Sequence, residues 1–212
     1  MKIYQFESKH PMNSNIVLPF KEIYTLENRK SQQEAFITTQ ILANAIEGDG
    51  ELNVDKVMMI AKYNANLVIS KVMNKLIVQA YSPITEIVDR IYSLVKTSLN
   101  VVLSKQEQFL IKQKIYEIFT NLYEQKQASW IFYQACSSRL TAYKYNLIFA
   151  VQNPFTNDSV HLLSMSLTVK IFRSSENILY LDKNDSISSS VKISCLKLIQ
   201  NVSEIMNNKL SI

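Results

Sequence analysis

Charge almost disappears from a long segment in the second half of this 212-residue chain. Only Arg139, Lys144 and Asp158 are charged between Gln127 and Val169, although 19% of the whole chain is charged. Within this segment, alternation of apolar and polar residues indicates β-strands. It is clearest from Val160 to Phe172, where apolar residues alternate with Ser164, Ser166, Thr168 and Lys170. The chain must therefore build a sheet with an apolar face that other elements cover in water.

Further strand patterns occur on both sides of this segment. Short apolar or alternating runs bounded by polar residues predict each of them. A helix is not excluded for the run that starts at Leu67. The expected strands are Met1 to Phe6, Ile16 to Phe20, Leu67 to Gln79, Ser129 to Ala135, Tyr143 to Gln152, Ile178 to Leu181 and Ser190 to Lys197.

Capping signals predict the helices, most of them in the first half. Ser31 with Glu34 forms the pattern of a capping box, in which two side chains satisfy free backbone N–H groups, and predicts a helix that ends near Ile46. Ser82 and Pro83 predict the start of another helix, with an apolar stripe that runs to Val102. The remaining predicted helices are Val54 to Tyr63, a helix from the capping box Ser104 to Glu107 through Leu122, and the tail Leu198 to Leu210.

The helices near Ile84 to Leu122 are joined by a short link, so an antiparallel helical hairpin is expected. No Pro/Gly-rich linker and no internal repeat divides the sequence. We therefore expect one α+β domain over residues 1–212, with helices packed on an antiparallel β-sheet.

The usual signatures of an enzyme are missing from the sequence. Gly48 and Gly50 are the only glycines, so no phosphate-binding loop and no nucleophile elbow can be written. Positive-φ positions must then fall mostly on Asn and Asp. His10 and His161 are isolated, and Cys136 and Cys195 have no metal-ligand spacing, although a disulfide between them stays open. We expect no catalytic residue, cofactor, metal or small-molecule substrate.

The formal net charge of +5 favours anionic partners, which are acidic lipid headgroups or nucleic acid. No Lys/Arg run or nucleic-acid-binding motif is present, so nucleic acid is not expected. A charge that only solubilises the chain is the simpler alternative. The start of the chain lacks the apolar core of a signal peptide, and no stretch is long enough for a transmembrane helix. A protein made in water-soluble form is expected.

The uncharged stretches Gln127 to Ser138, Tyr145 to Asn157 and Ser159 to Val169 are long enough for strands that cross a membrane. The same pattern suits a sheet that packs on helices in water. Both interpretations hold if the helices cover the sheet in water and detach from it at a membrane. Trp130, Tyr143, Tyr145 and Phe149 are expected to serve first as packing residues. The residues proposed to face lipid after insertion are Tyr145, Leu147, Phe149, Val151, Leu163, Met165, Leu167 and Val169.

Four segments of the sequence carry a resemblance to a known family. They are Ile41 to Ile46, Leu94 to Ser104, Phe119 to Phe132 and Tyr143 to Asn153. The third contains Thr-Asn-Leu, Gln-Lys and Trp-Ile-Phe. In order and spacing, these segments resemble the Cyt family of insecticidal δ-endotoxins. The resemblance runs from near the start to about Leu198, and is weak from Asp49 to Ala80.

The resemblance implies a single domain in which two helical hairpins wrap a central sheet, as in fungal cytolysins of the volvatoxin type. It also implies a secreted, haemolytic virulence toxin that binds membrane phospholipid directly, forms homo-oligomers and permeabilises target cells from outside. The alternative is a non-lytic lipid-binding or partner-binding module on the same fold. Asn121, Trp130 and Phe132 would be packing residues of the family motif. Family protoxins carry a prosegment removed by proteolysis; here the first expected strand begins at Met1, so the need for cleavage stays open.

Overall fold

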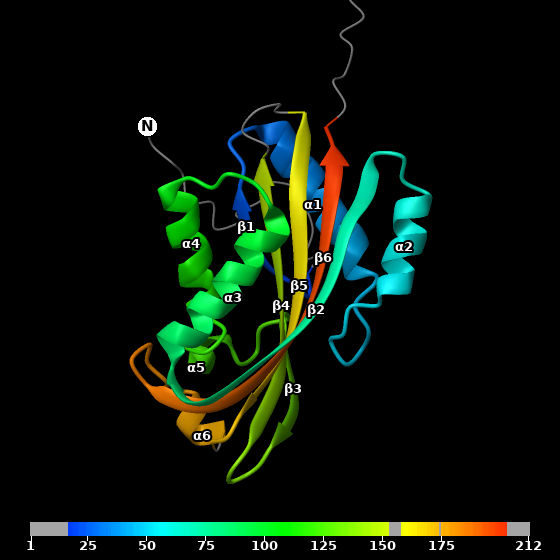
Figure 1. Ribbon diagram of the computed structural model, residues 1–212. Coiled ribbons are helices and arrows are strands. Elements are labelled where there is room, and N and C mark those ends of the chain that lie inside the picture. The colour runs from blue at the N-terminus through cyan, green and yellow to red at the C-terminus, as the bar shows by residue number, and fades with distance from the viewer. Residues whose placement is uncertain (1–16, 153–157, 174, 203–212) are drawn as a thin grey trace, which may run out of the picture.

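One mixed sheet forms the centre of the computed structural model, which describes residues 17–152, 158–173 and 175–202 (Figure 1). The strand order is β1-β4-β5-β6-β2, and β3 pairs with β4 beside β1. All neighbours are antiparallel except β1 and β4. The strands are β1 (Lys21–Thr25), β2 (Leu67–Pro83), β3 (Ile131–Cys136), β4 (Thr141–Gln152), β5 (Ser159–Ile171) and β6 (Ser186–Asn201).

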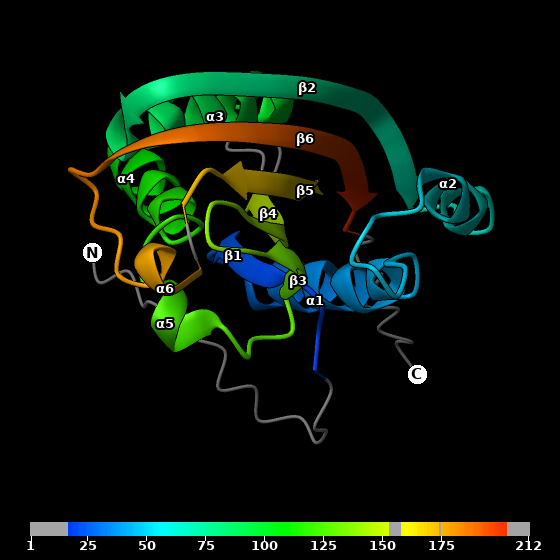
Figure 2. The same cartoon turned by 90° about the horizontal axis from the view of Figure 1, so that it is seen from below.

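Helices cover both faces of this sheet (Figure 2). The α3–α4 hairpin packs on one face, α1 packs on the other, and α2 lies beside the start of the edge strand β2. The expected α+β class is confirmed. The helices are α1 (Arg29–Ala43), α2 (Val54–Lys62), α3 (Ile84–Leu99), α4 (Lys105–Tyr116) and the short α5 (Leu122–Gln125) and α6 (Ser175–Ile178).

Two apolar cores lie on the two faces of the sheet. In β4, Leu147 and Phe149 point into the core under the α3–α4 hairpin, whereas Ile148 and Ala150 point into the core under α1. The central strands are therefore buried on both sides. This explains why charge is scarce along β4 and β5, since a charged side chain is rarely fully buried unless it has a partner.

The turn that joins α3 to α4 follows the sequence signals closely. Asn100 ends α3 in the left-handed conformation, with φ 49°, as expected for a chain with so few glycines. The capping box of α4 is confirmed: the Glu107 N–H donates to Ser104 Oγ at 3.2 Å, and the Ser104 N–H donates to Glu107 Oε2 at 2.7 Å. These local bonds set the hairpin's geometry.

The predicted boundaries of the strand at Ile16 to Phe20 and of the first helix are wrong. The strand expected at Ile16 to Phe20 lies later, at Lys21–Thr25, where it pairs in parallel with β4. The expected cap Ser31 is buried inside α1, because Asn28 caps the helix earlier by accepting from the Lys30 N–H at 2.8 Å. The helix also ends at Ala43, before Ile46.

Several other elements differ from their predicted positions, in part because strands pair with segments that are distant in the sequence. Ser82 does not cap α3; strand β2 continues to Pro83, and the Ile84 N–H donates to the Asp185 carbonyl at 3.0 Å. Val102 lies beyond α3 and is exposed. The strand expected at Ile178 to Leu181 is wrong, because helix α6 ends at Ile178. Residues 198–201 belong to β6 and not to a helix, whereas 203–210 and 1–6 lie outside the described residues.

Gly50, in the loop between α1 and α2, is held against the ring of Phe132. Its φ is +80°, and a Cβ atom built there would lie 2.5 Å from two ring carbons of Phe132. Both the backbone conformation and the close approach therefore require glycine. This contact places the loop on strand β3.

Replacing Gly50 with Ala is expected to lower the free energy of unfolding by about 1–3 kcal/mol, since it adds backbone strain and a clash. Gly48→Ala is the matched control, because nothing lies within 4 Å of the added Cβ and its φ is not in the left-handed region. Urea unfolding of both variants measures the difference. Equal stability of the two variants would contradict this account of the loop.

Candidate functional site

The candidate site is the apolar interface between the α3–α4 hairpin and the sheet. The eight strand residues proposed from the sequence to face lipid all lie on the sheet face that the hairpin covers, and each is at most 1% exposed. Three cross-strand pairs of β4 and β5 organise this face: Tyr145 with Leu167, Leu147 with Met165, and Phe149 with Leu163. The strand register thus brings all eight residues into one continuous apolar surface.

The hairpin supplies the other half of this interface. Apolar residues three or four apart on α3 and α4 form a stripe that faces the sheet. Its fully buried members are Ile84, Ile87, Val88, Ile91, Val95, Leu99, Ile111 and Ile115, followed by Ile118, Phe119 and Leu122.

Lys197, the cross-strand partner of Leu163, is the one buried charged residue on this sheet face among the described residues, and its Nζ donates to the Leu99 carbonyl of α3. Burial of each large side chain is worth about 1.5–3 kcal/mol in water, and this attraction has no preferred direction. The helices therefore protect the sheet from water without any specific chemistry at the centre of the contact.

A few directional contacts join the hairpin region and the sheet, and those of Tyr143 and Lys197 are buried. A neutral hydrogen bond contributes about 0.5–1.5 kcal/mol net, and one to a charged group about 1.5–3 kcal/mol. These contacts therefore add to a much larger apolar interface. The contacts are Tyr143 Oη donating to the Ile118 carbonyl at 2.6 Å, Tyr145 Oη to Gln125 Oε1 at 2.6 Å, Thr25 Oγ1 to Glu107 Oε1 at 2.9 Å, Lys197 Nζ to the Leu99 carbonyl, and the Lys21–Glu117 ion pair at 3.6 Å.

The aromatic residues that were expected to pack the sheet differ in their burial. Tyr143, Tyr145 and Phe149 are fully buried, which confirms that they pack the core. Trp130 is half-buried at its edge, with Lys21 Nζ 4.7 Å from the ring centroid.

The packing role expected for Asn121 is wrong, whereas Phe132 does pack, against Gly50. Asn121 is exposed, and its φ of 56° starts α5 in a left-handed turn. Asn tolerates that conformation better than most residues, so its contribution is to the backbone path.

The serine-rich face of β5 is covered as well. Ser164 is fully buried. Ser166 Oγ donates to Asn146 Oδ1 at 2.7 Å, and Asn146 Nδ2 donates to the Gly50 carbonyl at 3.1 Å. In this form the α1–α2 loop covers Asn146 and Ser166, whereas the buried Ser164 hydroxyl has no hydrogen-bond partner among the described residues.

Lys144 anchors that loop and was missed by sequence reasoning as a site residue. Its side chain is only 6% exposed, and Nζ contacts Asp49 Oδ2 at 2.7 Å and Glu51 Oε2 at 3.4 Å. The hydrogen bond from Lys144 holds the pKa of the Asp49 carboxyl below its usual value. The sequence signal that could have identified Lys144 is its position as a lone lysine in an otherwise uncharged strand. A buried lysine needs a carboxylate partner.

Neither metal chemistry nor a disulfide is found in the described part of the chain. No group of three His, Cys, Asp or Glu side chains there could hold a metal ion. Cys195 is a buried free thiol, so the disulfide alternative with Cys136 is wrong. Among the described helices, none combines the length and the apolar character needed to cross a membrane.

The Lys144 contact predicts a pH-dependent stability. A carboxyl whose pKa is lowered by folding stabilises the fold above its unfolded pKa, and this stabilisation is lost as pH falls through the lower folded pKa. For Asp49 the loss falls below about pH 4. Lys144→Met should weaken this acid-induced loss in urea unfolding measured at a series of pH values.

Lys75→Met is the control for that experiment, since Lys75 is exposed on β2 and has no carboxylate contact among the described residues. It should keep the native pH dependence. An unchanged acid-induced loss in Lys144→Met would show that the ion pair does not stabilise the loop.

Comparison with known proteins gives matches along most of the chain. A family model described as Bacillus thuringiensis toxin matches residues 9–212. The type-2Aa cytolytic delta-endotoxin of Bacillus thuringiensis subsp. kyushuensis is 28% identical over 165 residues, which cover 75% of this chain and 64% of that protein. The type-1Ba cytolytic delta-endotoxin of subsp. neoleoensis is 30% identical over 58% of this chain and 46% of its own length. The chain thus spans about half to two thirds of these relatives.

The fold has solved counterparts. The activated Cyt2Ba monomer from Bacillus thuringiensis subsp. israelensis superimposes with a TM-score of 0.81 at 22% identity, covering 88% of this chain and all of that one. A second structure, described as a delta-endotoxin, also gives a TM-score of 0.81, at 23% identity over 96% of this chain and 91% of that one. Both share the arrangement of one sheet wrapped by helices.

Proposed function

The chain belongs to the Bacillus thuringiensis toxin family, as the sequence resemblance predicted, and from this premise we propose that it is a pore-forming cytolysin. It binds membrane phospholipid directly, assembles into homo-oligomers and permeabilises target cell membranes. Its relatives are cytolytic delta-endotoxins by name. The observation that carries the proposal is the large apolar interface between the α3–α4 hairpin and the sheet.

The first step of the proposed mechanism is release of the hairpin. Acyl chains are as apolar as the leucine and isoleucine side chains of α3 and α4, so lipid can replace them on the sheet with little loss of apolar contact. The hydrogen bonds between the hairpin region and the sheet, such as that from Tyr143 to the Ile118 carbonyl, exchange for bonds to water or headgroups. Strand pairing within the sheet is kept throughout.

The second step is insertion of β4 and β5, with the eight apolar residues facing lipid. Each strand of this pair already has backbone partners on both sides over most of its length. The outer strands of the sheet leave unpaired N–H and C=O groups, which are costly in hydrocarbon. Several copies must therefore join edge to edge. The opposite face, which carries Asn146 and Ser166, would border water while α1 still covers its apolar residues Ile148 and Leu162.

This function needs no enzyme chemistry. The proposed partners are phospholipids and further copies of the chain, and no nucleic acid, cofactor or small-molecule substrate takes part. Leakage of a trapped dye from lipid vesicles tests it. Binding without leakage would instead favour the non-lytic lipid-binding module.

A cross-link between the hairpin and the sheet should block leakage and preserve vesicle binding. Thr25 Oγ1 of β1 lies 2.9 Å from Glu107 Oε1 of α4. Thr25→Cys with Glu107→Cys, joined by a short reducible thiol linker in a Cys136→Ser background, ties the two together. Reduction of the linker should restore the leakage measured by dye release.

The matched control joins the two helices to each other. Asp89 of α3 and Lys112 of α4 form an ion pair at 2.7 Å. Asp89→Cys with Lys112→Cys and the same linker leaves the hairpin free to move as a unit, so leakage should persist. Normal leakage from the linked Thr25/Glu107 variant would rule out hairpin release.

A further inference from the structure

Two basic side chains are buried next to each other where the end of α3 meets the sheet. His161 of β5 is 9% exposed, and Lys197 of β6 is 6% exposed. They alternate in step with Leu163 and Cys195 of the core under the hairpin, so they point to the face that the hairpin covers. Lys197 is the cross-strand partner of Leu163, two residues along β5 from His161. The two basic residues are therefore diagonal neighbours, which usually lie about 7–8 Å apart.

The hairpin itself holds Lys197. Its Nζ donates to the carbonyl of Leu99, the last residue of α3. The C-terminal end of a helix attracts a cation, because its free carbonyls carry partial negative charge. No carboxylate of the described residues lies within 4.0 Å of this Nζ. The end of the hairpin is therefore the partner of this buried charge in the closed form.

His161 has no comparable partner. Its Nδ1 is buried and forms no hydrogen bond with a described residue. Burial, and after it the charge of Lys197, lowers the pKa of this imidazole. The closed fold therefore favours a neutral His161, and a further proton would place a second cation in the same buried corner.

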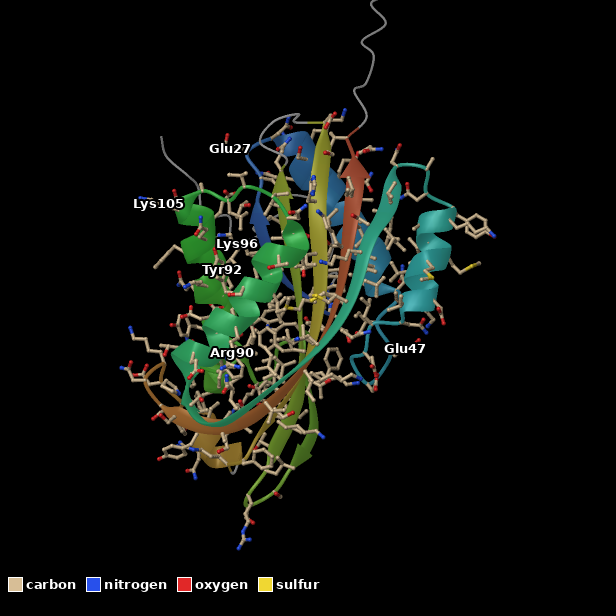
Figure 3. All side chains as sticks on the ribbon, viewed as in Figure 1. Glu27, Glu47, Arg90, Tyr92, Lys96 and Lys105 are labelled. Atoms are coloured by element: carbon tan, nitrogen blue, oxygen red, sulfur yellow. The ribbon has the colours of Figure 1, made fainter. Side chains whose placement is uncertain are left out.

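The surrounding elements supply no counter-charge to this pair. Glu107 of α4 accepts from Thr25 Oγ1 at 2.9 Å and from the Ser104 N–H at 2.7 Å. On β2, Lys71 is the cross-strand partner of Lys197 and adds positive charge on the same face. Among the described residues, no carboxylate forms an ion pair with either member of the pair. The other charged groups of these elements are Asp158 before β5, Lys75 of β2, Lys21 of β1, Glu86, Asp89, Arg90 and Lys96 of α3, and Lys105 and Lys112 of α4 (Figure 3 labels Arg90, Lys96 and Lys105).

The end of α3 lies over β5 and β6, near the start of β5 (Figure 1). While the hairpin stays there, it keeps water from the buried imidazole. When the hairpin moves away, both basic groups become hydrated, and water and salt screen their repulsion. Protonation of His161 thus costs more in the closed form than in the open form, and by linkage it favours opening.

We propose that His161 and Lys197 form an acid-sensitive latch: a proton taken up by His161 weakens the hold of Lys197 on the end of α3 and releases the hairpin. His161 is the group that senses pH, and the contact of Lys197 with the Leu99 carbonyl is the contact that it weakens. This inference rests on the proposed function, because it regulates the hairpin release on which that function depends.

The pH range of the latch follows from linkage. Above the ordinary histidine pKa of about 6.5, His161 is neutral in both forms and has no effect. As pH falls below this value, the open form takes up the proton first, so the closed form is progressively destabilised until it is protonated as well. The Asp49 contact is lost only below about pH 4. Measurements at pH 7.5 and 5.5 therefore isolate the latch from that contact.

The inserted state would accommodate both charges. His161 is the cross-strand partner of Val151, so it lies at one end of the apolar face formed by the eight residues proposed to contact lipid. At that end, headgroup phosphates can accept hydrogen bonds from both basic groups. A surface potential of about −30 mV also raises the local proton concentration about threefold. An anionic bilayer and mild acid therefore act on the latch in the same direction.

Leakage of a pH-insensitive dye from vesicles of phosphatidylcholine and phosphatidylglycerol, measured at pH 7.5 and 5.5, tests the latch. The charge of these lipids is constant over this range. The native chain should leak about three- to tenfold faster at pH 5.5. His161→Gln keeps a polar side chain that does not titrate, so its two rates should agree within about twofold. His10→Gln removes the other histidine of the chain and should keep the native acid response.

Two measurements in solution test the latch without lipid. The NMR titration of carbon-13-labelled histidine follows the imidazole of His161, whose signal is identified by its loss in His161→Gln. Lys197→Met removes the adjacent charge and should move this titration to higher pH, whereas Lys75→Met, at an exposed position of β2, should not. Hydrogen exchange of the α3 amides at pH 5.5 should be faster in the native chain than in His161→Gln.

The outcomes distinguish this inference from the proposed function. If the native chain leaked vesicles at neither pH, the proposed function would fail, and equal hydrogen exchange of α3 in the native chain and His161→Gln would overturn the latch separately. If the native chain leaked equally at both pH values, the latch would be overturned and the cytolysin proposal would stand. The same holds if His161→Gln, shown by circular dichroism to be folded, kept the acid response. A His161 titration unchanged by Lys197→Met would also overturn the latch.

Discussion

The fold depends above all on apolar contact between the α3–α4 hairpin and one face of the sheet. This contact is strong in water because it removes many apolar side chains of both partners from solvent, at about 25 cal/mol per Å² of apolar surface buried. Its strength depends on the surrounding water and comes much less from directed bonds between the hairpin and the sheet. Inside a bilayer that water is absent, so the hydrophobic contribution to the contact is lost. The same interface can thus hold the closed form together and permit it to open.

The opposite face of the sheet combines an apolar core under α1 with polar contacts to the α1–α2 loop. There Lys144, Asn146 and Ser166 hold the α1–α2 loop through an ion pair and hydrogen bonds. These contacts depend on geometry and charge, so they respond to pH more than to apolar solvents. The sheet therefore has one face that is covered mainly by apolar contact and one on which polar contacts to the α1–α2 loop lie beside an apolar core under α1.

The sequence indicates the central part of this arrangement well. Alternation along Val160 to Phe172 predicts β5, and the capping box at Ser104 predicts α4, because both signals are local. The same alternation also places the eight proposed lipid-facing residues on one face, as the strand register has them.

What the sequence could not supply are the contacts between distant segments. Asn28 rather than Ser31 caps α1, since two capping patterns compete within a few residues. The end of β6 reads as helix by itself but has hydrogen-bonding strands on both sides. Lys144 meets carboxylates 93 and 95 positions earlier, and nothing near Lys144 in the sequence identifies them.

The central claim is that the hairpin leaves the sheet when the protein acts on a membrane. A spin-label pair tests it most directly, with one label at Lys105 on α4 and the other at Lys170 on β5, both exposed. Pulsed electron paramagnetic resonance measures the distance between them in buffer and on vesicles that are being permeabilised. The account predicts that the single narrow distance in buffer is replaced on vesicles by changed and broader distances. An unchanged distance in a sample that leaks fully would contradict it.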